Sequence, residues 1–320
     1  MSLASQPNAN LVDDPYYARL KDHVIAATGL AYYNDRDDDL SAHFERRLTE
    51  LALADCGAYY TLLLSGAEGV VELDRLIEEL TIGETFFFRH RELFDALRDQ
   101  VLPAAIRRNR ASRRLRIWSA GCSFGAEPYS LSILLKRDLA HLVHGWDISI
   151  LATDVNRRFL DAARRGQFED WAFRGVPAEL REECFRSTGK RWSIAPQLRE
   201  GVSFHYHNLV EQTFPSLAHN LFGFDLILCR NVMIYFGKDV VRRLITQFHD
   251  SLNPEGWLLV GHVEPNPELY RAFQTLNASG AVLYQKPPAR QSLTAPPEPD
   301  RKPAADLCTA PLKNQPASAS

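Results

Sequence analysis

The residues best suited to hold a ligand lie in one glycine-containing stretch. Residues 115–130 read LRIWSAGCSFGAEPYS. The apolar start predicts a strand over 115–120, Gly121 to Gly125 predict a turn, and Pro128 is typical of a first helical turn. A strand, a glycine turn and a helix open the nucleotide-binding unit of α/β sheets, because glycine allows close approach and the helix start offers free N–H groups. The same pattern is also typical of a purely structural turn.

The spacing of the two glycines restricts the kind of nucleotide. Gly-x-x-x-Gly differs from the dinucleotide fingerprint G-x-G-x-x-G, and no Lys-Ser/Thr pair follows as in a P-loop. We therefore expect a small nucleoside. Asp154 ends a second predicted strand, 148–153, where a carboxylate can accept hydrogen bonds from ribose hydroxyl groups. The alternative role of Asp154 is to cap the following helix.

Two further stretches bring polar side chains to places where they could meet a ligand. The apolar run Phe224–Cys229 is typical of a central parallel strand, and the polar residues after it, Arg230 and Asn231, are expected to point into the ligand crevice. Residues 81–91 read TIGETFFFRHR. On a helix, positions 85 and 89 would share a face. This segment is either an apolar plug or a lid that carries polar groups into a cleft.

The surrounding pattern predicts the elements that position these residues. Apolar steps of three and four residues predict a helical bundle between positions 14 and 100, with core stripes at Leu40, Phe44, Leu48, Leu51 and at Leu73, Leu76, Ile77, Leu80. Further strands are expected at 202–207, 257–261 and 281–285, and helices at 128–142 and 238–252. Glycine and proline punctuate 166–201, which predicts a small inserted subdomain with one or two hairpins.

Composition narrows the class of protein. The 320 residues are 45% hydrophobic and 24% charged, as is usual for a soluble globular protein, and the net charge is -3. Five cysteines form no CxxC pair, which argues for reduced thiols in a cytoplasmic protein. No signal peptide or membrane-spanning run is evident, and we expect no metal site, because His205 and His207 have no third ligand nearby. Six arginines between positions 107 and 116 form either a solvated linker or an electrostatic footprint for an acidic partner.

Taken together, several segments resemble the CheR-type chemoreceptor methyltransferases. The matching segments, in the family's order, are TFFFR (85–89), WSAGCSFGAEPYS (118–130), ATDVN (152–156), Asn208-Leu209 and FDLILCRNVMIYF (224–236). The resemblance covers roughly residues 15 to 286. It implies an α/β fold, a Rossmann-like class I methyltransferase sheet, with an N-terminal helical domain and a small inserted β-subdomain.

The resemblance also implies domain limits. A loose N-terminus is expected at 1–13 and an N-terminal helical domain with linker at 14–100. The S-adenosylmethionine-binding domain is expected at 101–286, with the β-subdomain at 166–201 inserted in it. The Pro/Ala/Ser-rich segment 287–320 predicts a disordered tail.

The family's cofactor shell maps onto individual residues. The residues that the resemblance assigns to S-adenosylmethionine, whose product is S-adenosyl-L-homocysteine, are Thr85, Arg89, Gly121, Glu127, Asp154, Asn208, Leu209, Arg230 and Asn231. Among them, Asp154 is expected to bind the ribose hydroxyl groups. Arg89 and Tyr235 are the candidates for orienting the substrate carboxylate, as catalytic residues.

The chain also departs from the family pattern. Gly83 stands where the family often has Asn, Phe124 replaces Thr and Ala126 replaces Glu, while 261–264 read GHVE in place of GHSE. These changes bear on cofactor affinity more than on fold. The segment 187–199 also looks shorter than in relatives whose subdomain grips a receptor's C-terminal pentapeptide.

The implied reaction is methyl transfer to glutamate side chains of chemoreceptors. A glutamate is already ionised at neutral pH, so alignment replaces a general base. The expected partners are the cytoplasmic domains of chemoreceptors, without nucleic acid and without direct membrane insertion, and the protein is expected to be a monomer. Two alternatives are a methyltransferase for another substrate and a non-catalytic S-adenosylmethionine-binding adaptor.

Overall fold

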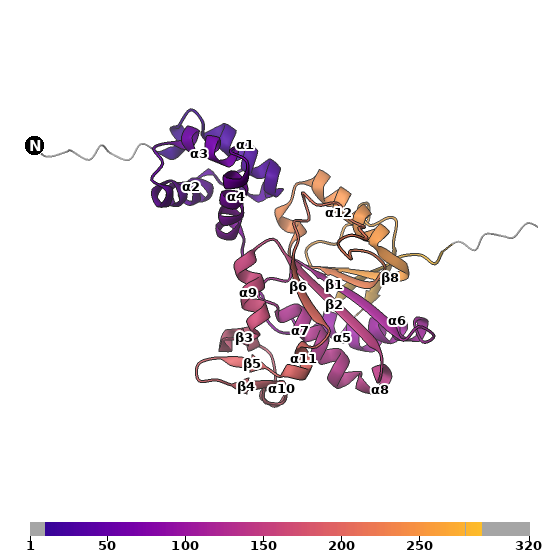
Figure 1. The fold of residues 1–320 in the computed structure, drawn as a ribbon. Helices are drawn as coiled ribbons and strands as arrows, with labels where there is room; N and C mark the ends of the chain where they lie inside the picture. The colour runs from indigo at the N-terminus through magenta and orange to yellow at the C-terminus, as the bar shows by residue number, and fades with distance from the viewer. Residues whose placement is uncertain (1–9, 279, 290–320) are drawn as a thin grey trace, which may run out of the picture. The chain divides into compact units, whose positions relative to one another are not determined.

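The computed structural model describes residues 10–278 and 280–289, and its centre is a seven-stranded sheet in the order β6-β2-β1-β7-β8-β10-β9 (Figure 1). The strands are β1 (Arg114–Ala120), β2 (Asp147–Asp154), β6 (Val202–Tyr206), β7 (Phe224–Cys229), β8 (Leu252–Val260), β9 (Gln274–Ala278) and β10 (Ala281–Gln285). The first five in spatial order are parallel, while β10 is antiparallel to β8 and β9. The predicted α/β class is confirmed.

The strands predicted from sequence are confirmed, with one extension and one omission. β8 begins at Leu252, earlier than the predicted 257, directly after the preceding helix. β9 was missed because it is the edge strand, and four of its five residues are exposed. A strand with little buried surface carries no apolar signal for sequence patterns to detect.

Helices cover both faces of the sheet, because consecutive apolar side chains of β1 point to opposite faces and both must be buried. Ile117 packs in a core with helical residues from positions 93 to 106 and 131 to 143, whereas its neighbour Trp118 packs in a second core with Phe248. The helical segments on these faces are α5 (Arg91–Ala96), η3 (Leu97–Val101), α6 (Leu102–Arg108), α7 (Ala126–Ile133), η4 (Leu134–Asp138), α8 (Ala140–Val143), α9 (Arg157–Arg165) and α12 (Lys238–Ser251). The run from α5 to α6 crosses the predicted boundary at residue 100 without a break.

The N-terminal helices enclose a core of their own. They are α1 (Tyr17–Thr28), α2 (Asp37–Leu51), α3 (Cys56–Leu63) and α4 (Ala67–Leu80), with short 3-10 turns η1 (Leu11–Asp13) and η2 (Ala31–Tyr33). The two predicted stripes are confirmed: Leu40, Phe44 and Leu76 are fully buried, and Leu51 and Leu73 pack at the margin. Of the expected loose N-terminus, residues 1–9 lie outside the described residues, as does nearly all of the expected tail.

A second, smaller sheet lies within the predicted insertion. Its strands, β3 (Gln167–Phe168), β4 (Phe185–Ser187) and β5 (Trp192–Ile194), are antiparallel in the order β3-β5-β4, and η5 (Asp170–Phe173), α10 (Ala178–Cys184) and α11 (Pro196–Arg199) accompany them. Phe87, from the segment before α5, stacks on Phe173 with ring centres 5.1 Å apart. The small sheet is thereby packed against the segment that was predicted to be a plug or a lid.

The arginine-rich stretch lies at the amino end of β1, and the residues predicted to bind ligand follow the carboxyl end of the same strand. Arg108 pairs with Asp225, and Arg114 pairs with Asp147 at 3.2 Å. Arg116 donates to Asn220 at 2.9 Å. Arg108, Arg114 and Arg116 therefore bind the fold at the amino end of β1, away from the predicted site. Arg107 and Arg110 are exposed, so a footprint for an acidic partner stays a prediction.

Other connections of the sheet include η6 (Met233–Tyr235) after β7. Within the part of the chain that the structure describes, no helix combines the length and apolar character that a bilayer crossing needs.

Candidate active site

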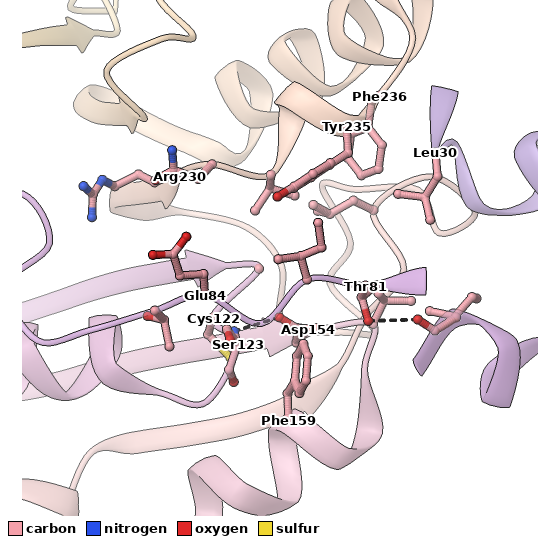
Figure 2. A pocket seen from close by; sticks show the side chains of 18 of the residues that line it. Leu30, Thr81, Glu84, Cys122, Ser123, Asp154, Phe159, Arg230, Tyr235 and Phe236 are labelled. Atoms are coloured by element: carbon pink, nitrogen blue, oxygen red, sulfur yellow. Dashed lines mark hydrogen bonds between the residues drawn. The ribbon is translucent and has the colours of Figure 1, made fainter. Parts of the chain in front are cut away.

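A pocket opens where β1, β2 and β7 end, because Gly121, Asp154 and Arg230 directly follow or close those strands (Figure 2). Every residue that the sequence placed in the site lines this pocket. They are Thr85, Arg89, Gly121, Glu127, Asp154, Asn208, Leu209, Arg230, Asn231 and Tyr235. The carboxyl edge of a parallel sheet is the general ligand position in such folds.

The glycine turn is held tightly at the end of β1. Gly121 has a φ of 76°, and its N–H donates to the Thr153 carbonyl at 2.8 Å. A Cβ at Gly121 would lie 2.3 Å from Cγ2 of Val232. The turn therefore needs glycine for two reasons, its left-handed backbone and a close protein contact. The structural role of this turn is confirmed, and because Gly121 also lines the pocket, its role in ligand binding stays a prediction.

Asp154 is buried at the end of β2, with 8% of its surface exposed. One carboxylate oxygen accepts the N–H of Ser123 at 2.8 Å and the other accepts the N–H of Asn156 at 2.9 Å; Figure 2 marks the first of these bonds. Burial raises the pKa of Asp154 to about 6, against these backbone N–H groups, which lower it. Each oxygen keeps a lone pair, so two hydroxyl donors can still be accepted.

The alternative role predicted for Asp154 is wrong. The helix α9 is capped by the Asn156 side chain, which accepts the N–H of Phe159 at 3.1 Å. Asp154 instead connects the two turns that follow β1 and β2. Because Asp154 does not cap α9, its carboxylate can accept hydrogen bonds from a ligand.

A buried ion pair joins α7 to the end of β7. Glu127 accepts from the Ser119 hydroxyl at 2.8 Å and from Nη1 of Arg230 at 2.9 Å. Arg230 has 8% of its surface exposed, and its Nε has no hydrogen-bond partner among the described residues. The pair holds Arg230 in place while leaving one of its donors unused. Ser119 was missed by sequence reasoning, since a serine inside an apolar strand gives no ligand signal.

Arg89 brings a positive charge to the pocket and forms no salt bridge with any carboxylate in the described part of the chain. Its Nη1 donates to the backbone carbonyl of Glu84 at 2.6 Å, and its buried Nε has no partner among the described residues. Burial, joined by the positive charges of Arg230 and Arg174 and opposed by Glu84, lowers the pKa of Arg89. A guanidinium in this environment is well suited to bind an incoming carboxylate.

Residues 81–90 do not form the helix on which Thr85 and Arg89 were imagined to share a face. The three phenylalanines explain the irregular course, because each packs in a different direction. Phe86 lies under the Arg174 guanidinium at 3.9 Å, Phe87 enters the core of the small sheet, and Phe88 contacts Phe94 of α5.

Tyr235 lies at the end of η6 and packs edge-on against Tyr32, with ring centres 5.5 Å apart. Burial raises the pKa of Tyr235, so the phenol stays protonated at neutral pH and can donate a hydrogen bond. Figure 2 shows Tyr235 and Arg230 on one side of the pocket and Asp154, Ser123 and Phe159 on the other.

The remaining predicted residues follow β6. The Asn208 side chain accepts the N–H of Val210 at 2.9 Å, and Leu209 is buried in the second sheet core. His207 is buried beside Trp118, and burial lowers its pKa to about 4. His205 is exposed on β6, whereas His207 lies beyond the end of that strand and is buried, so the two histidines that were considered as a metal pair lie in different environments.

The structure joins two of the positions that depart from the family pattern. A Cβ at Gly83 would lie 2.6 Å from the rings of both Phe124 and Phe159, whose own ring centres are 4.4 Å apart. The large side chain at 124 therefore occupies the space that a side chain at 83 would need. Phe159, which lines the pocket, was missed because an apolar residue in a helix is ordinarily read as core.

The pocket fits a nucleoside that carries a charged amino acid group. Asp154 offers acceptors for hydroxyl groups, Phe159 and Tyr32 offer apolar surface, and buried donors without partners lie on Arg89 and Arg230. The Ser123 hydroxyl, also buried without a partner among the described residues, adds a further polar group. These groups would hold S-adenosylmethionine.

Comparison with known proteins gives a consistent result. Residues 83–282 match the family described as CheR methyltransferase, SAM binding domain. The chain is 32% identical over 263 residues to Chemotaxis protein methyltransferase 1 of Pseudomonas aeruginosa, which covers 80% of this chain and 92% of that protein. It is 29% identical to Chemotaxis protein methyltransferase 2 of Vibrio cholerae, covering 88% and 96%, and 36% identical to Chemotaxis protein methyltransferase of Listeria innocua, covering 64% and 74%.

Proposed function

The chain belongs to the CheR methyltransferase family, and on this basis we propose that it forms methyl esters on glutamate side chains of chemoreceptors. It is an S-adenosylmethionine-dependent methyltransferase. The observation that carries the choice of a carboxylate substrate is Arg89, a half-buried cation that lines the pocket without an acidic partner among the described residues. The relatives named as chemotaxis methyltransferases support chemoreceptors as the substrate class.

Methyl transfer to a carboxylate requires the protein to bind and align the two reactants. S-adenosylmethionine, when bound, supplies a methyl group on a positively charged sulfur, and the electron pair of the broken carbon–sulfur bond stays on that sulfur. The acceptor glutamate uses an oxygen lone pair to form the new bond and needs no base, because its pKa of about 4.3 leaves it ionised at neutral pH. Positioning alone can lower such a barrier by roughly 7–11 kcal/mol.

The roles of the residues follow from their placement. Asp154 holds ribose hydroxyl groups, and Asn208 and Leu209 line the same pocket. Thr85, Gly121, Glu127, Arg230 and Asn231 complete the shell around the cofactor. Arg89 binds the substrate carboxylate, and the Tyr235 phenol donates to it from the opposite wall. The aromatic residues around the opening exclude water from the line of transfer.

The test is methyl transfer from radiolabelled S-adenosylmethionine onto membranes that contain chemoreceptors from the source organism. Label is expected in the receptors, and mild base is expected to release it as methanol, as a methyl ester requires. Arg89→Gln should abolish most incorporation, whereas Arg98→Gln, which removes an exposed arginine of η3 bound to Asp99, should leave it unchanged. Binding without incorporation would favour the adaptor alternative, and base-stable label would favour a different acceptor.

A further inference from the structure

A chain of polar contacts connects Ser119 of β1 to His90 through Glu127 and Arg230. The Ser119 hydroxyl donates to Glu127, Glu127 accepts from Nη1 of Arg230, and Nη2 of Arg230 lies 3.3 Å from Nδ1 of His90. The His90 ring then packs edge-on against His262, with ring centres 4.7 Å apart. His90 is the member of this chain of contacts for which the reaction provides no evident role.

The contact between Arg230 and His90 fixes the proton on the imidazole ring. A guanidinium has donors and no acceptor, so Nδ1 of His90 must be the acceptor. The neutral ring then carries its hydrogen on Nε2. A protonated His90 would present a second N–H to Arg230 and place two positive charges in contact. The geometry is therefore compatible with neutral His90 alone.

Arg230 separates the cofactor pocket from a second pocket. The second pocket is lined by His90, Leu93, Arg230, Val260, His262 and neighbouring residues of β9 and β10, and none of its described lining residues is acidic. One end of the guanidinium is fixed by Glu127. The other end faces this second pocket, where His90 is the acceptor that the structure provides. Without it, the guanidinium could turn away from the cofactor side.

We propose that His90 is a positioning residue that, in its neutral form, holds Arg230 in the orientation used to bind the cofactor. This inference rests on the proposed function, since it assigns Arg230 to the cofactor shell of the methyltransferase. His90 itself touches neither the cofactor nor the reacting atoms. It acts through the second guanidinium nitrogen, as outer-sphere hydrogen bonds commonly do for binding groups.

The surroundings of His90 support this role. The groups that face it are Arg230, His262, Arg89 and Glu92. Burial, followed by the positive charges of Arg230, His262 and Arg89, lowers the pKa of His90 against the opposing effect of Glu92. The hydrogen bond is therefore fully present above the ordinary histidine pKa of 6.5 and is lost as the pH falls through the lowered value.

The test compares three variants of the full chain by calorimetric titration with S-adenosylhomocysteine from pH 5.5 to 8. His90→Asn keeps an acceptor at the position of Nδ1 but cannot be protonated, and it should bind like wild type at pH 8. His90→Leu removes the acceptor and should weaken binding about 10-fold at pH 8 if one hydrogen bond to a charged group is lost. The matched control, His141→Asn, changes an exposed histidine of α8 and should follow wild type throughout.

Burial raises the pKa of Asp154 to about 6, so wild-type affinity is expected to fall in acid for a second reason besides protonation of His90. The informative quantity is the difference between wild type and His90→Asn, which should be near zero at pH 8 and grow as the pH falls. Histidine nitrogen NMR gives a second readout: the resonance that disappears in His90→Asn should show an unprotonated Nδ1 at pH 7.5. An Nδ1–H tautomer, or equal affinities for Asn and Leu variants, would overturn the proposal. Failure of receptor methylation by wild type would reject the proposed function and leave these binding measurements interpretable.

Discussion

Within residues 10–278 and 280–289, the buried arginines Arg47 and Arg230 both pair with glutamates, and the two differ in how completely their hydrogen bonds are satisfied. In the helical region, Arg47 contacts both oxygens of Glu72, at 2.8 and 2.7 Å, and also reaches Glu50 and Glu79. Tyr59 adds a donor to Glu72 at 2.8 Å. In the pocket, Arg230 makes one bond to Glu127 and leaves its Nε without a partner among the described residues.

The difference separates a group that holds the fold from a group that awaits a ligand. Arg47 and Glu72 spend their hydrogen-bonding capacity inside the protein, so they can only contribute to the folded structure. Arg230 retains a donor that is buried at some energetic cost. Arg89 and Ser123 in the same pocket also have a buried polar atom without a partner among the described residues, although Arg116 and Ser251 outside the pocket do too.

The largest effect is expected from the saturated pair. Arg47→Met leaves Glu72 buried with only Tyr59 as a donor, and removing one partner of a buried pair costs roughly 3–5 kcal/mol. We expect a matching fall in the free energy of unfolding, measured by urea denaturation. S-adenosylhomocysteine affinity, measured at a temperature where the variant remains folded, should change little. A decrease of less than about 1 kcal/mol in the free energy of unfolding would show that the pair contributes little to the stability of the helical region.

Asp154→Ala should have the opposite effect, with a large loss of cofactor affinity and little change in stability. Losing one hydroxyl bond to a charged acceptor costs about 1.5–3 kcal/mol, which weakens S-adenosylmethionine and S-adenosylhomocysteine binding at least ~10-fold. Titration calorimetry measures the affinity, and circular dichroism checks the fold. Because ligand hydroxyl groups favour the ionised carboxylate, binding to wild type should also weaken as the pH falls through about 6 and Asp154 becomes protonated. Unchanged binding by a folded Asp154→Ala protein would remove the central residue of the site.

Gly83→Ala places a methyl group where the rings of Phe124 and Phe159 now lie. Overpacking of this kind costs about 1–3 kcal/mol, and we expect it to lower both the melting temperature and cofactor affinity. Adding Phe124→Ala should recover part of the loss, so a double-mutant cycle should show coupling between the two positions. Gly237→Ala is the matched control, since its new Cβ would have an ordinary 3.5 Å contact. Additive effects would mean that the two departures are unrelated.

Tyr235→Phe should give the smallest and most selective change. The phenol is expected to meet the substrate carboxylate, so its loss should lower the rate of methyl transfer about 10-fold, the equivalent of one hydrogen bond. Cofactor affinity and melting temperature should stay near wild type. Single-turnover kinetics separate the rate from binding. An equal loss of cofactor affinity would place Tyr235 in the cofactor shell rather than beside the acceptor.

The sequence predicted the sheet strands and the residues around the pocket because strand ends carry local signals. Asp154 and Arg230 each follow an apolar run, and parallel topology brings such ends together. The sequence did not reveal the partners of those residues. Ser119 and Phe159 look like parts of ordinary secondary structure, and the contact between Gly83 and Phe124 depends on how distant segments pack. The course of residues 81–90 was also misjudged, because Phe87 enters the core of the small sheet while Phe86 and Phe88 contact Arg174 and Phe94.

The contacts of the segment 81–90 determine where a chimera of two related chains should be joined. Thr81 accepts from Asn156 of the α9 cap at 2.8 Å, the Phe87 N–H donates to Ala172, and the Phe88 N–H donates to Ser130 of α7. Thr81 also donates to Ile77 at the end of α4, but the bonds of Phe87 and Phe88 are to the insertion and to α7 beside the sheet. A chimera that swaps the N-terminal helices should therefore cross over before residue 81, so that the segment is inherited together with the sheet that holds it. A crossover near residue 100 would combine the segment 81–90 of one relative, including the residue at position 89, with the pocket of another.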